Sequence, residues 1–184
     1  VCSSDLLFRS GERQRKKNAQ ILASGVAVNW ALKAQELLQK DWGVSADVWS
    51  VTSWNELRRD GLAVDSHNLL NPKNKKTAYV HDKLKGTEGP VIAVSDFMRA
   101  VQDQIAPWVP NAFHSLGTDG FGLSDTRGAL RRHFKVDAES IVVATLAELA
   151  KAGEVKESVV QEAIDKYRIF DVRSADAGNT EGSG

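Results

Sequence analysis

The feature of this sequence that most constrains its fold is the alternation of short apolar runs with longer amphipathic segments. The first run covers residues 19–24 and ends at Gly25. From 26 to 40 the apolar residues recur close to the helical repeat, and the next run, 44–51, has the length of a strand. A strand, a helix and a second strand in this order predict two parallel strands joined by a crossover helix.

The rest of the chain continues this alternation. Two further strands are predicted over residues 91–94 and 112–116, and residues 61–76 are interpreted as a polar loop. Further helices are predicted over residues 53–60, 77–84, 97–106, 124–133, 137–152 and 156–167. The expected fold class is α/β, with a three-layer architecture in which helices cover both faces of a mixed, mostly parallel sheet.

Both ends of the chain differ in character from this central region. Residues 1–10 equal the translation of a string common in sequencing adapters followed by a second copy of the end of that string, so they are predicted to be foreign to the protein. The alternative is an ordinary flexible terminus. Residues 11–18 are charged and lack an apolar face, and 1–18 together are expected to form a non-native or disordered leader. The folded domain is predicted over 19–170 and a disordered tail over 171–184.

Composition excludes several classes of function. Lys plus Arg and Asp plus Glu number 24 each, so the basic footprint of a nucleic-acid-binding chain is missing. No apolar run approaches the roughly 20 residues that cross a bilayer, and no membrane partner is expected. The single cysteine, Cys2, excludes an internal disulfide and favours a reducing, cytoplasmic setting. The four histidines, His67, His81, His114 and His133, lack the close spacing of zinc ligands.

The glycine-rich segment Gly117–Gly122 is the most conspicuous candidate for a functional site. It follows a predicted strand, so it should lie at the carboxyl edge of the sheet, where α/β proteins place functional crevices. It has neither the Walker pattern nor the dinucleotide pattern of glycines, so a phosphate cradle is disfavoured. We expect this loop to serve architecture and subunit contact, with Phe121 as an apolar anchor and Asp119 outside the chemistry.

Three other groups of residues allow two interpretations each. His114 is a candidate general acid or base, although a core or interface histidine is the commoner case. Arg127, Arg131 and Arg132 form either an anion-binding patch or a solvated helix face, and the second is again commoner. The five tryptophans suit a core or a subunit interface better than a base-stacking surface, because no basic stripe accompanies them.

Two signatures resemble one enzyme family. The segments 25–27, 43–57 and 59–61, followed by 116–122 and 124–127, are similar to the C-terminal region of the homodimeric pyruvate dehydrogenases. These are the thiamine-dependent, decarboxylating components of their complex. Phe134, 136–138 and 142–143 continue the resemblance, which covers about residues 19–170 in order.

The resemblance implies a transketolase-like C-terminal domain and a fragment of a longer, homodimeric, cytoplasmic enzyme. That enzyme would decarboxylate pyruvate with thiamine diphosphate and Mg²⁺, and transfer acetyl to the lipoyl group of dihydrolipoyl acetyltransferase. Nothing here resembles the segments that bind the cofactor, which lie in preceding domains of the family. We therefore assign no catalytic, cofactor-binding or metal-binding residue to this chain, and we expect the isolated segment to be inactive.

Two alternatives remain open. One is the C-terminal domain of another thiamine enzyme of the transketolase group, against which the segment 44–60 argues. The other is a stand-alone, non-catalytic α/β interaction domain. A start codon just upstream of residue 19 would favour the stand-alone domain, whereas a reading frame of several hundred preceding residues would favour the fragment.

Overall fold

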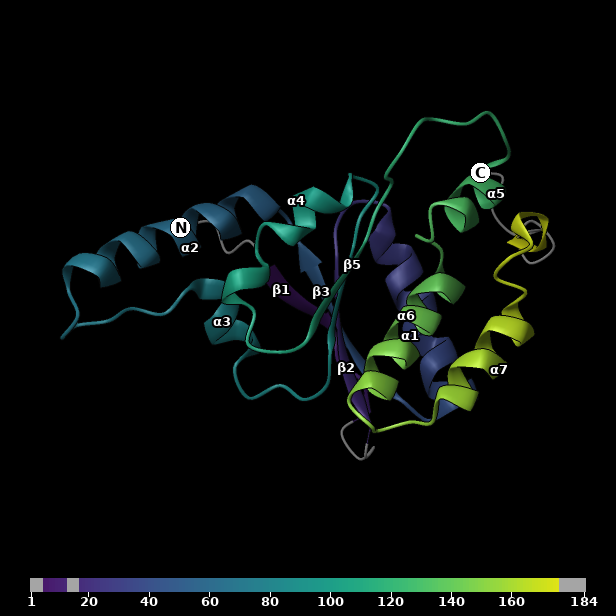
Figure 1. Cartoon of the computed structure of the whole chain (residues 1–184), viewed down its shortest axis with the longest axis horizontal. Coiled ribbons are helices and arrows are strands. Elements are labelled where there is room, and N and C mark those ends of the chain that lie inside the picture. The colour runs from purple at the N-terminus through teal and green to yellow at the C-terminus, as the bar shows by residue number, and fades with distance from the viewer. Residues whose placement is uncertain (1–4, 13–16, 176–184) are drawn as a thin grey trace.

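One five-stranded sheet runs through the middle of the molecule (Figure 1). Its strand order is β1-β3-β2-β4-β5. The computed structural model of this chain describes residues 5–12 and 17–175. The strands are β1 Asp5–Arg9, β2 Asn18–Ala23, β3 Ser45–Val51, β4 Val91–Val94 and β5 Phe113–Leu116. Four of them are parallel, and β1 lies antiparallel against β3. The predicted mixed, mostly parallel sheet is confirmed.

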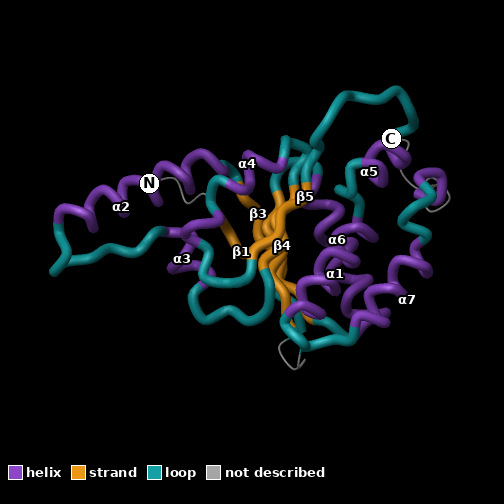
Figure 2. The backbone as a smooth tube through the Cα atoms, in the orientation of Figure 1, coloured by secondary structure: helices purple, strands orange, loops and turns teal. Residues whose placement is uncertain are grey.

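Helices cover both faces of this sheet, as the predicted three-layer architecture requires (Figure 2). One face carries α1 Ala27–Trp42, α5 Arg127–His133, α6 Ala138–Lys151 and α7 Glu157–Tyr167, and the other carries α2 Trp54–Leu70, α3 Tyr79–Leu84 and α4 Arg99–Asp103. Two 3₁₀ turns, η1 Ala106–Trp108 and η2 Val172–Ala175, complete the described elements.

Strand β4 is a continuous apolar run and β2 is mostly apolar, because both faces of these central strands are buried. Ile21 and Val48 pack into the core beneath α1 and α6, whereas their neighbours Leu22 and Trp49 pack into the core beneath α2 and α3. Successive side chains of a strand point to opposite faces, so the central strands β2, β3 and β4 each supply both cores.

Several helix ends form as the sequence predicts. Gly43 ends α1 with a φ of 63° and donates its N–H to Leu38 O, because glycine enters the left-handed region without a Cβ penalty. Ser53 Oγ accepts the N–H of Glu56 at 3.2 Å at the start of α2. Asp137 Oδ1 accepts the N–H of Ser140 at 3.0 Å at the start of α6.

Three predicted helix boundaries are wrong. Helix α2 continues to Leu70 instead of ending near residue 60, because Gly61 does not break it. A Cβ at Gly61 would lie 2.3 Å from the Trp108 ring, so this glycine allows α2 and η1 to approach closely. The helix predicted over 97–106 is shortened to α4, with η1 after it. Helix α5 begins at Arg127, with Thr126 and not Ser124 as its capping residue.

The two predicted terminal regions contain ordered structure. Within the expected leader, β1 pairs with β3, and the Gly11 N–H donates to Asp47 Oδ1 at 2.7 Å. Any segment of suitable length can gain backbone hydrogen bonds by pairing with the edge of a sheet, so this pairing does not test whether residues 1–10 come from an adapter. The adapter origin of residues 1–10 stays a prediction. Within the expected tail, η2 packs against α5. Residues 1–4, 13–16 and 176–184 lie outside the described residues.

No helix within residues 5–12 and 17–175 combines the length and the apolar character needed to cross a membrane.

Candidate functional site

The carboxyl edge of the parallel strands brings two loops together. The segment after β4 and the segment after β5 are joined by Thr118, whose N–H donates to Phe97 O at 2.9 Å. The Thr118 hydroxyl donates to Asp96 O at 2.6 Å. A Cβ at Gly117 would lie 2.5 Å from Phe97 O, so the close approach of the two loops requires glycine there. The first glycine of the predicted loop therefore has a structural role.

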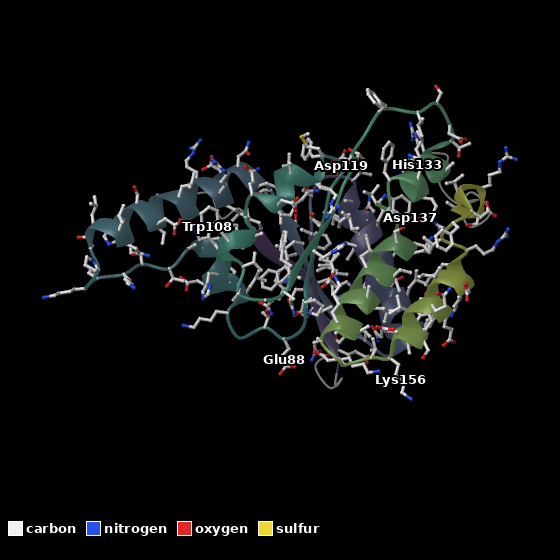
Figure 3. The ribbon with its side chains drawn as sticks, viewed as in Figure 1. Glu88, Trp108, Asp119, His133, Asp137 and Lys156 are labelled. Atoms are coloured by element: carbon white, nitrogen blue, oxygen red, sulfur yellow. The ribbon has the colours of Figure 1, made fainter. Side chains whose placement is uncertain are left out.

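Asp119 also joins the two loops. Its Oδ1 accepts the backbone N–H of Arg99 at 3.0 Å, at the start of α4 (Figure 3). Beyond Asp119 the chain leaves the body of the molecule as an arch that returns at α5 (Figure 2). Gly120 has a φ of 98°, and Phe121 is 94% exposed at this arch. These contacts favour an architectural role for Asp119, and its exclusion from the chemistry stays a prediction.

An apolar cavity of about 220 Å³ opens at the same edge, between α1, α5 and the Thr118 loop. Its lining residues are Val26, Ala27, Trp30, Asp96, Thr118, Leu130, Arg131, Phe134 and Val136. The Arg131 guanidinium lies 4.5 Å from the centre of the Trp30 ring, a cation–π contact. Burial, and then the charge of Arg127, lower the pKa of Arg131. The lining is mostly apolar, with Asp96, Thr118 and Arg131 as its polar members.

The sequence did not reveal this cavity, because its lining comes from four separated segments. The only local signal is the helical spacing that places Val26 and Trp30 on one side of α1. The contribution of Leu130, Phe134 and Val136 depends on how α5 returns to the sheet, which no local pattern specifies.

The structure does not support an anion patch made of the three arginines. Arg127 is exposed and Arg131 stacks on Trp30, whereas Arg132 is 3% exposed. The expected solvated helix face is therefore wrong for Arg132. Its Nε donates to Asp137 Oδ2, and its Nη1 donates to Tyr167 O at 2.9 Å and Ser174 Oγ at 2.8 Å. A buried guanidinium needs such acceptors, and these tie α5 to α6 and to the C-terminal segment.

His114 lies on the edge strand β5, half-buried, with its Nδ1 3.2 Å from Glu148 Oε1. Glu148 also accepts Lys151 Nζ at 2.6 Å. Burial lowers the pKa of His114 and outweighs the attraction of the Glu148 carboxylate. His114 does not line the carboxyl-edge cavity, which disfavours the interpretation as a general acid or base.

The lowered pKa of His114 predicts a pH dependence of stability. On acidification below pH 6.5 the unfolded chain binds the proton first, so this histidine contributes a loss of stability as the pH falls. We expect His114→Gln to reduce the drop in urea midpoint between pH 7 and about pH 5. His133→Gln, at an exposed histidine, is the control and should leave that drop unchanged. An equal drop in His114→Gln and in the unmodified chain would contradict the assignment.

The tryptophans serve packing, as expected. Trp49 and Trp54 are buried and donate their indole N–H groups to Gln20 Oε1 at 2.8 Å and Ser24 Oγ at 2.9 Å. Trp42 and Trp108 also have hydrogen-bonded indoles, to the Tyr167 hydroxyl and Asp65. In the described part of the chain no three His, Cys, Asp or Glu side chains gather as metal ligands do, and Cys2 lies outside that part.

Comparison with known proteins identifies the fold and the family. A family model described as the transketolase-like TK C-terminal domain matches residues 7–137. Among solved structures, that of a split gene transketolase, inactive beta4 tetramer, has a TM-score of 0.54 at 20% identity, covering 79% of this chain and 42% of that one. The transketolase from Campylobacter jejuni has a TM-score of 0.51 at 19% identity, covering 78% and 18%.

Several relatives with higher sequence identity are named pyruvate dehydrogenase E1 component. The protein from Mycolicibacterium smegmatis is 56% identical over 170 residues, which cover 92% of this chain and 18% of that protein. The protein from Mycobacterium tuberculosis is 53% identical, over 95% of this chain and 19% of that protein. The protein from Escherichia coli K12 is 43% identical, over 84% of this chain and 17% of that protein. The chain thus spans less than a fifth of their length and belongs to the transketolase-like C-terminal domain family.

Proposed function

We propose that this chain is the C-terminal domain of a pyruvate dehydrogenase E1 component. The observation that carries the proposal is the 56% identity with the E1 component of M. smegmatis over 170 residues. The complete enzyme decarboxylates pyruvate and transfers the two-carbon unit to a lipoyl group of dihydrolipoyl acetyltransferase. In this transfer the former keto carbon of pyruvate is oxidised to the level of an acetyl group, and the disulfide of the lipoyl group is reduced. The reaction places the complete enzyme among the oxidoreductases of central carbon metabolism, and we propose a cytoplasmic location for it.

The cofactor of this proposal is thiamine diphosphate with Mg²⁺, and the residues of this chain do not fit it. The cavity at the carboxyl edge is apolar, and Asp96 is the only carboxylate in its lining. A diphosphate bound through Mg²⁺ needs several oxygen ligands, and the described residues offer no cluster of acidic groups for the metal. We therefore assign the cofactor to domains outside this chain, and we assign no catalytic residue here.

The proposed role of this domain is to complete the subunit and the homodimer around the catalytic domains. The exposed arch with Phe121 suits this role, because large apolar side chains are anchors of interfaces. One structural relative, the split gene transketolase, is a tetramer of β chains, which supports an oligomeric assembly. Dihydrolipoyl acetyltransferase is the further partner that the reaction requires.

The proposal is tested by recovering the complete coding sequence and measuring carbon dioxide release from pyruvate. The assay contains thiamine diphosphate, Mg²⁺ and dihydrolipoyl acetyltransferase, and a parallel reaction replaces pyruvate with 2-oxoglutarate. A third reaction supplies xylulose 5-phosphate with an aldose phosphate as acceptor, and its sugar-phosphate products are measured directly because no carbon dioxide is released. We expect turnover of pyruvate alone. Turnover of the ketose phosphate in place of pyruvate would assign the chain to another transketolase-group enzyme, and a reading frame without preceding domains would favour a stand-alone interaction domain.

The isolated 184-residue chain is expected to bind no thiamine diphosphate and to release no carbon dioxide from pyruvate. The physical reason is the lack of a polar, acidic cavity at the carboxyl edge and of an acidic metal-binding cluster among the described residues. Titration calorimetry with thiamine diphosphate and Mg²⁺ tests this, with the complete enzyme as positive control. Tight, magnesium-dependent binding by the isolated chain would contradict it.

A further inference from the structure

The dipeptide Asp-Gly occurs twice in this chain, at residues 60–61 and 119–120. In this dipeptide the aspartate side chain closes readily on the backbone, because glycine has no Cβ to obstruct the nitrogen that follows the aspartate. The ring that forms is a five-membered succinimide, and its opening can leave an isoaspartate. The two sites share this reactive sequence, so the surrounding structure decides which of them reacts.

The side chains of the two aspartates make similar contacts. Asp60 Oδ2 accepts the backbone N–H of Tyr79 at 2.6 Å, and Asp119 Oδ1 accepts the backbone N–H of Arg99 at 3.0 Å. Each carboxylate is thus held by one backbone donor from another segment of the chain. These contacts do not distinguish the two sites, although Asp60 is half-buried and Asp119 is exposed.

The backbone around Asp60 is protected. Asp60 and Gly61 lie inside α2, where each N–H donates to the carbonyl four residues earlier, and Gly61 is buried against Trp108. For the Gly61 nitrogen to reach the carboxyl carbon of Asp60, the backbone must rotate out of the helical conformation. Ring closure at this site therefore requires local opening of the helix.

The backbone around Asp119 lacks this protection. Asp119 lies at the base of the arch between β5 and α5, and residues 119–127 are all exposed (Figure 3). No described residue accepts a hydrogen bond from the Gly120 N–H, and the position of a Cβ on Gly120 lies in open space. The Gly120 nitrogen can therefore approach the carboxyl carbon of Asp119 without breaking a helix or a sheet.

We propose that Asp119 is a site of spontaneous conversion to isoaspartate and that Asp60 is not. The Gly120 nitrogen forms a bond with the side-chain carboxyl carbon of Asp119, and the hydroxyl of the protonated carboxyl leaves as water with the amide proton. Water then adds to the main-chain carbonyl of the ring, and the original bond between Asp119 and Gly120 breaks. The chain now runs through the former side chain, and Cα carries a free carboxylate. One water is released and one is consumed, so the conversion needs no co-reactant.

The conversion changes the joint between the two loops at the carboxyl edge. The new carboxylate is attached directly to Cα, one carbon shorter than the side chain that now reaches the Arg99 N–H. The main chain of the arch is also longer by one methylene. We expect the hydrogen bond at Arg99 to weaken, so the Arg99 amide should exchange with solvent faster in the converted chain. An unchanged exchange rate at Arg99 would contradict this consequence.

Ageing of the folded 184-residue chain, followed by peptide mapping, tests the proposal. The chain is incubated at mildly acidic pH, and electron-transfer fragmentation distinguishes isoaspartate from aspartate in the tryptic peptides of the two sites. A parallel sample is kept in concentrated urea, where both sites are unfolded. We expect conversion about tenfold or more faster at Asp119 than at Asp60 in the folded chain, and at similar rates in urea. Equal rates at the two sites of the folded chain would overturn the proposal.

Gly120→Ala is the matched variant, because its added Cβ crowds the attacking nitrogen and contacts no other part of the molecule. Conversion at Asp119 should slow several-fold in this variant, whereas conversion at Asp60 should keep its rate. Far-UV circular dichroism of each sample verifies that the chain is folded during the incubation. An unchanged rate at Asp119 in Gly120→Ala would also overturn the proposal, since ring closure by the nitrogen of residue 120 would then not limit the conversion.

Discussion

Arg132→Ala is expected to destabilise the fold by about 3–5 kcal/mol, the usual cost of removing one partner of a buried ion pair. The substitution leaves the carboxylate of Asp137 and the carbonyl of Tyr167 without the guanidinium that now satisfies them. It also removes the connection from α5 to Ser174. Urea unfolding of the 184-residue chain, followed by far-UV circular dichroism, measures the loss.

Arg127→Ala is the matched control, because Arg127 is exposed and lies at the start of the same helix. Its expected cost is roughly 0.5 kcal/mol or less. Similar midpoints for Arg132→Ala and Arg127→Ala would show that the buried guanidinium contributes no more than a solvated one. Arg132→Lys should recover only part of the loss, since an ammonium cannot reproduce the planar set of donors.

Gly89→Ala is expected to cost about 3 kcal/mol or more, because strain and a steric clash act together. Gly89 has a φ of 82°, a region that L side chains rarely adopt. An added Cβ would lie 1.7 Å from the backbone oxygen of Asn18, at the start of β2. Since Asn18 is part of the sheet, the overlap can be relieved only by moving β2 or the turn before β4. The readout is the urea midpoint of the same chain.

Gly120→Ala is the control that separates the cost of backbone strain from the cost of a steric clash. Gly120 also has a positive φ, 98°, but no atom lies within 4 Å of the position of an added Cβ. The expected cost is about 1 kcal/mol, from backbone strain alone. If Gly89→Ala and Gly120→Ala shift the midpoint equally, the close approach of Gly89 to Asn18 is not a constraint on the fold.

The sequence predicts those parts of the fold that depend on local patterns. The strands over 19–24 and 44–51 and the helix between them were identified because apolar periodicity and Gly43 specify them locally. The capping residues Ser53 and Asp137 were found for the same reason. The resemblance to pyruvate dehydrogenases also agrees with the relatives that share more than half of their aligned residues with this chain.

The errors arise where tertiary packing overrides a local rule. Gly61 resembles a helix end, but it lies in the middle of α2 because Trp108 packs against it. Arg132 follows Arg131 in an apparently solvated helix, yet one faces Trp30 and the other is buried against Asp137. Whether a charged side chain on a helix is buried or exposed depends on which distant segments of the chain pack against that helix. For Arg132 that includes Ser174, 42 residues later.

Two acceptors of the buried Arg132 guanidinium, Tyr167 O and Ser174 Oγ, lie well beyond the end of the family match. The family match ends at residue 137, but Ile141, Leu146 and Leu149 of α6 belong to the main core. Of α7 only Ala163 is fully buried, while Val159, Val160 and Tyr167 pack partly buried against the same core. A chain that ends before Ser174 lacks the Ser174 hydroxyl, and one that ends before Tyr167 also lacks the Tyr167 carbonyl. Both groups accept hydrogen bonds from the Arg132 guanidinium, which is buried away from water. We therefore expect a chain that ends at residue 137, the boundary of the family match, to be less stable than one that retains Ser174.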